Sequence, residues 1–225
     1  MSTKPDRAPV RGLYGMVDTS ASPHLQHLEL AEALLQAGVS VLQLRMKDAD
    51  DAQRLPILRA LKELADPAGA QVLVNDHVHL ASAVPGVGVH LGQDDHDPRQ
   101  ARAILGDSVL IGLSTHTPRQ AREAEGLGVD YIGYGPIFSA RGKHISAQDQ
   151  RPLRSPVGLA ALKAVVREAA VPVVAIGGID LDRLPLLLAT GVEAVAVLSA
   201  VTSAPSPVDA ARAFQAGFHA NTRSA

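Results

Sequence analysis

The sequence predicts a (β/α)8 barrel, the TIM-barrel fold, with eight parallel strands. Short apolar runs rich in β-branched residues alternate with longer amphipathic runs along most of the 225 residues. The short runs are typical of parallel strands buried on both faces, and the longer runs are typical of helices that cover a sheet. The alternation occurs eight times, and the chain length suits one closed barrel. We therefore expect a single domain over residues 1–225, with the barrel at about 12–218 and a polar tail at each end.

The N-terminal half contains the first four strand–helix units. In the first predicted helix, Leu28, Ala31, Leu34 and Leu35 recur at the three- and four-residue spacing of a buried helical face. The other units repeat this change from an unbroken apolar run to a helical period. The expected strands are 12–17, 39–44, 72–74 and 88–91, and the expected helices are 24–37, 52–64, 78–84 and 98–105.

The C-terminal half contains four more units, joined by short turns. Gly38, Gly128 and Gly191 each follow a predicted helix, where glycine supplies a left-handed cap before the next strand. An open doubly wound sheet is the alternative, but no Gly-x-Gly-x-x-Gly motif follows the first strand. The expected strands are 109–113, 131–134, 172–176 and 194–198, and the expected helices are 118–127, 159–169, 181–189 and 207–216.

Composition narrows the class of protein. Twenty-one Lys and Arg residues against 23 Asp and Glu give a net charge of −2, which offers no support for nucleic-acid or membrane binding. The absence of cysteine excludes a disulfide, a thiol nucleophile and a zinc–thiolate site. Residues 1–11 lack the apolar core of a signal peptide, and no apolar run approaches the ~20 residues that span a bilayer. We expect a cytoplasmic enzyme acting on small molecules, with homo-oligomers possible.

Residues that follow the predicted strands are the candidates for chemistry, because barrel enzymes place their sites at the carboxyl ends of the strands. Gly177, Gly178 and Ser199 follow the last two strands, where barrels often bind phosphate through backbone N–H groups. Arg45 and Lys47, after the second strand, add charged donors for phosphate oxygens. A plain strand-to-helix turn is the alternative explanation of the two glycines.

Two carboxylates also follow adjacent strands. Asp76 and Asp95 are of the type that Mg²⁺ prefers when it also binds waters and substrate phosphates. The alternative is that both cap the helices that follow. A third feature is the connection from Tyr134 to Leu159, about two dozen residues rich in Gly, Ser, Arg and Pro. We expect it to be an active-site loop, with a lineage-specific insertion as the alternative.

Taken in order, the strand-end phrases resemble those of the thiamine phosphate synthase family over about residues 12–216. The phrases are QLRMK at 43–47, VND at 74–76, HLGQDD at 90–95, IGLSTH at 111–116, YIGYGPIF at 131–138, AIGGI at 175–179 and AVAVLSA at 194–200. The resemblance implies a transferase that joins hydroxymethylpyrimidine diphosphate to hydroxyethylthiazole phosphate. The products would be thiamine phosphate and pyrophosphate, formed with Mg²⁺ through a pyrimidine carbocation, without an enzyme nucleophile.

The resemblance also implies roles for particular residues. Mg²⁺ would be held by Asp76 and Asp95, and the thiazole phosphate by Gly178, Leu198 and Ser199. The residues implied to act on the leaving group or the reacting ring are Arg45, Lys47, Ser114 and Lys143. The residues implied to contact the pyrimidine diphosphate are Gln43, Arg45, Lys47, Asn75, Ser114 and Lys143.

The sequence departs from the family pattern in two places. Met46 replaces the acid of the usual Arg-Glu-Lys motif, and residues 140–143 replace a Thr-x-Thr-Lys loop. Ala140 and Gly142 carry no hydroxyl, and Arg141 is a candidate substitute donor for the thiazole phosphate. Two alternatives stay open. One is a thiazole tautomerase-like paralogue, although Pro136 stands where that branch has a catalytic His; the other is a degenerate barrel that binds a phosphorylated ligand without catalysis.

Overall fold

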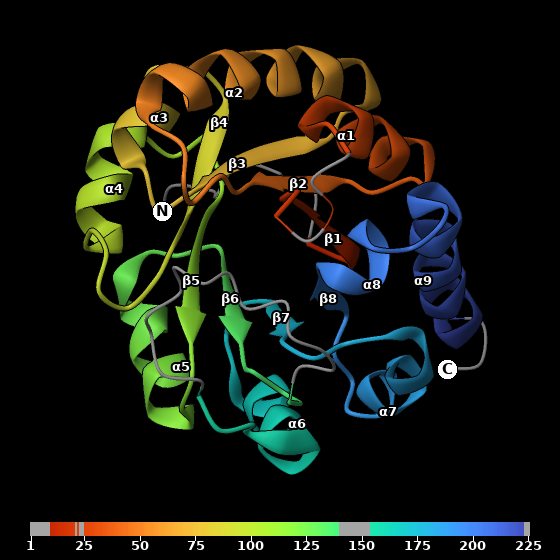
Figure 1. The fold of residues 1–225 in the computed structure, drawn as a ribbon. Coiled ribbons are helices and arrows are strands. Elements are labelled where there is room, and N and C mark those ends of the chain that lie inside the picture. Colours follow the sequence, from red (N-terminus) through yellow and green to blue (C-terminus); the bar gives the residue numbers. More distant parts are fainter. Residues whose placement is uncertain (1–9, 21, 23–24, 140–153, 223–225) are drawn as a thin grey trace.

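The fold is a closed barrel of parallel strands surrounded by helices. The computed structural model describes residues 10–20, 22, 25–139 and 154–222. Within them the strands pair in chain order, and the last pairs with the first (Figure 1). The predicted fold class is confirmed. The strands are β1 (Gly12–Val17), β2 (Val41–Leu44), β3 (Gln71–Asn75), β4 (Val87–Leu91), β5 (Ile111–Thr115), β6 (Tyr131–Tyr134), β7 (Val173–Ile176) and β8 (Ala194–Val197).

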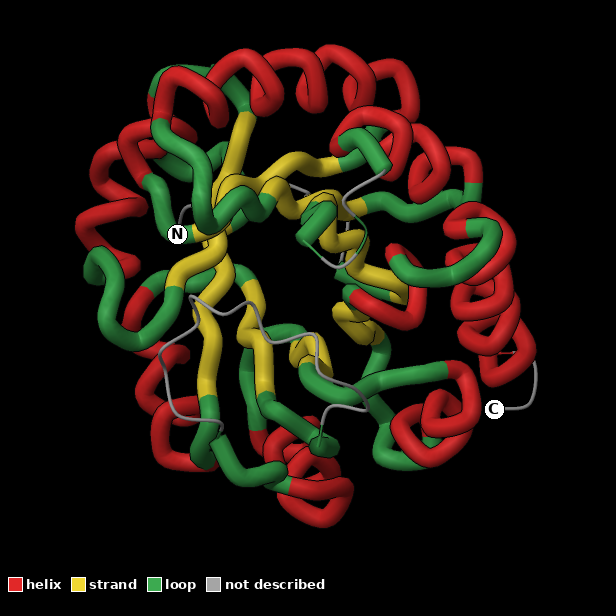
Figure 2. The backbone as a smooth tube through the Cα atoms, in the orientation of Figure 1, coloured by secondary structure: helices red, strands yellow, loops and turns green. Residues whose placement is uncertain are grey.

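The helices form a ring outside the strands (Figure 2). The main helices are α1 (His27–Gln36), α2 (Asp51–Ala65), α3 (Val78–Ser82), α4 (Pro98–Leu105), α5 (Pro118–Ala124), α6 (Gly158–Glu168), α7 (Leu184–Leu188) and α9 (Pro207–Thr222). Three short 3₁₀ turns, η1 (Asp66–Ala68), η2 (Glu125–Leu127) and η3 (Leu181–Arg183), adjoin α2, α5 and α7. No described helix has both the length and the apolar character needed to cross a membrane.

Several elements differ from the sequence-based expectation, most of them by one to three residues at a boundary. The one-turn helix α8 (Ser199–Thr202) follows β8 and was not expected. The helix α9 ends at Thr222 rather than near 216, because its apolar face continues beyond the fully buried Phe214. The strand β5 covers 111–115 rather than 109–113, since it pairs with β4 from Ile111 onwards. The predicted left-handed conformation of the glycines after α1, η2 and α7 is confirmed.

Two apolar clusters occupy the two sides of the barrel wall. The larger lies between the strands and the helices. The smaller fills part of the interior and contains Val41, Leu73, Leu110 and Val174, with the rings of two tyrosines packed against them. Polar interior side chains such as Gln43 and Ser114 lie nearer the carboxyl ends of their strands. The barrel is therefore closed by apolar packing at one end and open to polar chemistry at the other.

One side chain of α9 bridges the join between the first and last elements. The carboxamide oxygen of Gln215 accepts a hydrogen bond from the backbone N–H of Leu13 at 3.0 Å. Its carboxamide nitrogen donates to the backbone oxygen of Gly38 at 2.7 Å. At the same place the N–H of Gly12 donates to the Glu193 carbonyl at 2.7 Å. The start of β1, the turn after α1 and the start of β8 are thus fixed together.

Candidate active site

Two adjoining cavities lie at the carboxyl ends of the strands. One has a volume of about 570 Å³ and the other about 790 Å³. Four side chains line both cavities: Arg45, Asn75, His90 and Ser114. The smaller cavity extends towards the turns after β7 and β8, and the larger extends over β3 and β4. The site can therefore hold two small molecules side by side, with the four shared residues between them.

The smaller cavity contains the residues predicted to bind the thiazole phosphate. Gly178, Leu198 and Ser199 all line it. Gly177 and Gly178 have φ angles of +90° and +65°. A Cβ atom at Gly178 would lie 2.6 Å from the Phe138 carbonyl oxygen, so the loop after β6 also requires glycine here. These glycines therefore pack against the loop after β6 and also border the cavity.

Arg183 joins the two loops at the wall of this cavity. Its guanidinium donates hydrogen bonds to the carbonyl oxygens of Gly178 and Ser139 and lies 4.7 Å from the centre of the Phe138 ring. Cation–π contact and hydrogen bonding together fix the planar group. The side chain thereby holds the loop after β7 against the loop after β6. Sequence reasoning missed Arg183, since it follows no strand directly.

Arg45 is held by a buried carboxylate. One guanidinium nitrogen forms an ion pair with Asp18, whose side chain is only 4% exposed. Asp18 follows β1 directly and also accepts a hydrogen bond from the Ser20 N–H at 2.9 Å. A paired and partly buried guanidinium has a fixed orientation, which favours recognition of phosphate. Lys47 lines the larger cavity, whereas Lys143 and Arg141 lie outside the described residues.

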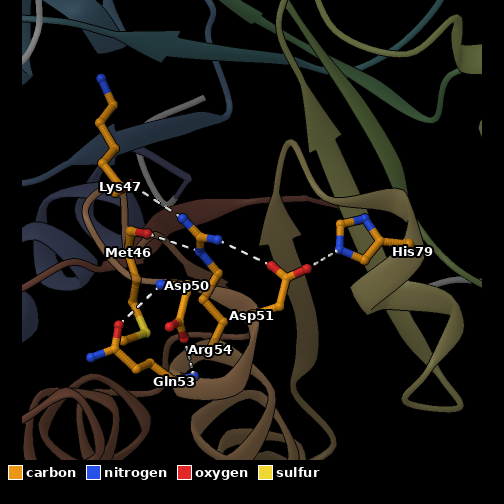
Figure 3. Close-up of polar contacts among 7 residues, drawn as sticks. All are labelled: Met46, Lys47, Asp50, Asp51, Gln53, Arg54 and His79. Carbon is orange, nitrogen blue, oxygen red and sulfur yellow. Dashed lines mark hydrogen bonds and ion pairs between the residues drawn. The ribbon is translucent and has the colours of Figure 1, made fainter.

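Arg54 holds the backbone of the loop that carries Lys47 (Figure 3). It donates to the carbonyl oxygens of Met46 at 3.0 Å and Lys47 at 3.2 Å, and to the carboxylate of Asp51 at 3.1 Å. The other oxygen of Asp51 lies 2.7 Å from Nε2 of His79. In Figure 3 the Lys47 side chain extends away from Arg54. Arg54 is largely buried, and it holds this loop through backbone oxygens rather than through the Lys47 side chain.

The same corner contains a three-residue group of possible metal ligands. Ligand atoms of Asp51, His77 and His79 all lie within 4.8 Å of one another. Arg54 already donates to the Asp51 carboxylate, and its fixed positive charge opposes a cation there. We therefore assign no metal to this group.

Asp76 and Asp95 both line the larger cavity. One oxygen of Asp76 accepts from the Asn75 side chain at 2.6 Å, and one oxygen of Asp95 accepts from the Gly92 N–H at 2.7 Å. The helix-cap alternative is wrong for both. The helix α3 has no side-chain cap, and α4 is capped by Asp97. Carboxylates that face one cavity beside cationic side chains are suited to Mg²⁺ bound together with a phosphorylated substrate.

Asp76 also has a strained backbone. Its φ angle is +66°, and it is the one described non-glycine residue with a positive φ. Side chains with a Cβ pay a free-energy cost in this region, and such residues tend to occur at functional sites. The strain is consistent with a position selected for its carboxylate rather than for stability.

We predict that two substitutions of Asp76 affect activity equally but affect the free energy of unfolding differently. Asp76→Gly and Asp76→Ala should both lose Mg²⁺-dependent activity. In thermal or urea unfolding, the glycine variant should be more stable than the alanine variant by about 1 kcal/mol, because only alanine retains the Cβ penalty. Equal unfolding free energies for the two variants would contradict the strain.

Ser114 lies within β5 and contacts a buried histidine. Its hydroxyl lies 2.9 Å from Nε2 of His90, which is on β4. Burial lowers the pKa of His90 to about 4, so the ring is neutral at neutral pH. Gln43, Asn75 and Ser114 therefore border the cavities beside a neutral ring rather than a cation. The sequence placed His90 at the end of the fourth predicted strand but gave it no role of its own.

The fold and the site together define a class: a TIM-barrel enzyme whose site can hold phosphorylated small molecules at the carboxyl ends of its strands. The family model described as thiamine monophosphate synthase matches residues 13–201. The chain belongs to the thiamine monophosphate synthase family.

Individual relatives agree with this assignment. A thiamine-phosphate synthase from Azoarcus sp. is 38% identical over 93% of this chain and 98% of its own length. One from Synechococcus sp. is 45% identical over 80% of this chain, and the chain spans 49% of that longer relative. A solved structure of thiamine phosphate pyrophosphorylase from Pyrococcus furiosus has a TM-score of 0.81 and 32% identity, covering 93% of this chain and 96% of its own.

Proposed function

We propose that this chain joins hydroxymethylpyrimidine diphosphate to hydroxyethylthiazole phosphate, releasing pyrophosphate. The observation that carries the proposal is the pair of adjoining cavities with four shared lining residues. The larger cavity, with Arg45, Lys47, Asp76 and Asp95, would hold the diphosphate. The smaller cavity, with Gly178 and Ser199, would hold the thiazole phosphate. The reacting carbon and nitrogen would then meet near Ser114.

The residues of the larger cavity suit a departing pyrophosphate. Negative charge grows on the leaving group as the C–O bond breaks, and fixed positive charges stabilise it. Asp18 orients the Arg45 guanidinium for this role, and Arg54 fixes the backbone that carries Lys47. Gln43, Asn75 and Ser114 would hold the pyrimidine ring while the bond breaks. The bond to the thiazole nitrogen forms after or as pyrophosphate leaves, so the protein supplies orientation and charge rather than a nucleophile.

The family uses Mg²⁺, and we propose that Asp76 and Asp95 hold it here. When bound, the ion would neutralise diphosphate oxygens as a Lewis acid. The two aspartates come from the loops after β3 and β4, whose neighbouring strands bring them to one cavity. Asn75 and the Gly92 N–H orient one oxygen of each carboxylate.

A direct test is synthesis of thiamine phosphate by the purified protein with both substrates and Mg²⁺. We expect equal amounts of thiamine phosphate and pyrophosphate, and no product when either substrate is omitted. Isomerisation of a thiazole substrate without pyrophosphate release would instead support the tautomerase alternative. Binding of both substrates without product would support the degenerate-barrel alternative.

The altered loop at 140–143 predicts weak binding of the thiazole phosphate. These residues lie outside the described residues, so this prediction depends on the sequence. Each missing hydroxyl hydrogen bond is worth about 0.5–1.5 kcal/mol, and loss of two should raise the KM for the thiazole phosphate roughly 5- to 150-fold. Restoring Thr at Ala140 and Gly142 should lower that KM and leave the KM for the pyrimidine diphosphate nearly unchanged. An unchanged KM in the double variant would show either that Arg141 already compensates or that the natural second substrate is a different molecule.

A further inference from the structure

A chain of hydrogen bonds crosses the barrel interior beneath the two cavities. The Gln43 carboxamide nitrogen donates to the Tyr14 hydroxyl at 2.9 Å, and that hydroxyl lies 2.8 Å from the Tyr131 hydroxyl. The Tyr131 hydroxyl lies 2.8 Å from Nδ1 of His90, whose Nε2 lies 2.9 Å from the Ser114 hydroxyl. The chain joins β2, β1, β6, β4 and β5, and both of its ends border the smaller cavity.

Which atom donates in each of these hydrogen bonds follows from the first bond, in which the Gln43 nitrogen donates to the Tyr14 hydroxyl. Since the Gln43 nitrogen donates to Tyr14, the Tyr14 proton is directed to Tyr131. The Tyr131 proton is then directed to Nδ1 of His90, which must accept. A neutral imidazole that accepts at Nδ1 carries its proton on Nε2, so His90 donates to Ser114. The Ser114 oxygen is thereby engaged as an acceptor, and its own proton is left for a ligand.

The interior provides space for this chain at Gly112. A Cβ atom there would lie 2.1 Å from the Tyr131 ring, a distance that no side chain permits. Tyr14 and Tyr131 are 3% and 0% exposed, so solvent cannot readily replace a missing partner. Buried polar groups of this kind are costly unless all are satisfied, so the bonds between Gln43 and Ser114 must all run in the same direction.

We propose that Tyr14, Tyr131 and His90 are positioning residues that fix Ser114 as a hydrogen-bond donor and Gln43 as an acceptor towards the pyrimidine ring. The proposal rests on the proposed function. With its nitrogen committed to Tyr14, Gln43 presents its carboxamide oxygen to the ligand; within the described part of the chain that oxygen makes no hydrogen bond. An aminopyrimidine offers the complementary pair, an amino N–H and a ring nitrogen. This series of hydrogen bonds therefore favours binding of a ring that has an amino N–H and a ring nitrogen over a ring that has a carbonyl and a ring N–H.

The first test uses the free protein and needs no substrate. The ¹⁵N chemical shifts of the two His90 ring nitrogens distinguish the protonated from the unprotonated nitrogen, and the His90→Gln variant assigns the signals. We expect the proton on Nε2 in the native protein. In Tyr131→Phe, Nδ1 loses its donor, and we expect a mixture of the two tautomers. A proton on Nδ1 in the native protein would overturn the proposal.

The second test compares two Tyr→Phe changes on the same strand. Tyr131→Phe should raise the KM for the pyrimidine diphosphate roughly 3- to 10-fold, the effect of one neutral hydrogen bond, and leave the KM for the thiazole phosphate unchanged. Tyr134→Phe is the matched control, because its buried hydroxyl has no hydrogen-bond partner within the described residues. It should leave both KM values unchanged. Equal KM values for the two variants would overturn the proposal.

A conservative replacement separates positioning from packing. A glutamine at position 90 can accept from Tyr131 and donate to Ser114 in the same direction as the native ring, whereas leucine can do neither. His90→Gln should therefore retain a lower pyrimidine diphosphate KM than His90→Leu. If the native protein forms no thiamine phosphate, the proposed function fails, yet the ring-nitrogen test still decides the direction of the chain. If the native protein is active and Tyr131→Phe matches it, only the positioning proposal fails.

Discussion

Asp95→Ala is expected to lower kcat by a factor of about 10² or more, because in the proposed function Asp95 would be one of two carboxylates that hold the Mg²⁺ needed by the leaving diphosphate. Raising the Mg²⁺ concentration should restore little of the lost kcat if the variant can no longer hold the ion in the right position. Steady-state pyrophosphate release across a Mg²⁺ series measures the change. Calorimetric titration of Mg²⁺ in the presence of pyrophosphate gives a second readout that does not depend on turnover.

Two neighbouring aspartates serve as controls for Asp95. Asp97→Asn removes a charge but preserves a good cap for α4, so it should have near-native kcat. Asp94 borders the same cavity, and Asp94→Asn tests whether the ligand has been assigned to the wrong residue. A large loss in Asp94→Asn together with native turnover in Asp95→Ala would transfer the metal to Asp94.

Arg45→Lys is expected to lower kcat/KM for the pyrimidine diphosphate roughly 10- to 100-fold. Lysine keeps the charge but loses the planar fork, and with it either the bond to Asp18 or one bond to phosphate. A hydrogen bond to a charged group is worth about 1.5–3 kcal/mol, which sets the size of the effect. Arg119→Lys, on the exposed face of α5, is the matched control. Native kinetics in Arg45→Lys would show that Arg45 acts only as a positive charge, without the two-point geometry.

Most of the fold was predictable because the strands are short and mainly apolar and the helices between them have a helical period. The prediction failed where polar residues continue a strand. Thr115 was assigned to the region after the fifth strand, yet it lies in β5, fully buried, with its hydroxyl donating to the Gly133 carbonyl at 3.1 Å. A hydrogen bond inside the core satisfies that hydroxyl, and hydrophobic pattern alone contains no sign of such a partner.

Which residues border the candidate site was also largely predictable, because of the geometry of the barrel. Carboxyl ends of parallel strands meet at one end of a barrel, so strand-end residues such as Asp76 and Asp95 fall beside one cavity. The contacts that orient the side chains of the site were not predictable from the sequence. Tyr14 and Tyr131 are 117 positions apart, and Arg45 meets Asp18 across 27. Pairings between distant positions depend on register and side-chain direction, which no local pattern determines.

The bridge made by Gln215 has a consequence for how the protein is made. Leu13 and Gln215 are 202 positions apart, so at about 5–20 residues per second the ribosome delivers the second partner roughly 10–40 s after the first. β1 has no partner on its β8 side until β8 emerges, and the Gly38 carbonyl lacks the donor from α9 until Gln215 follows. An unpaired strand edge invites contact with other nascent chains. During synthesis the first strand can therefore pair with β2 early, but its β8 side stays open until the last strand and helix follow.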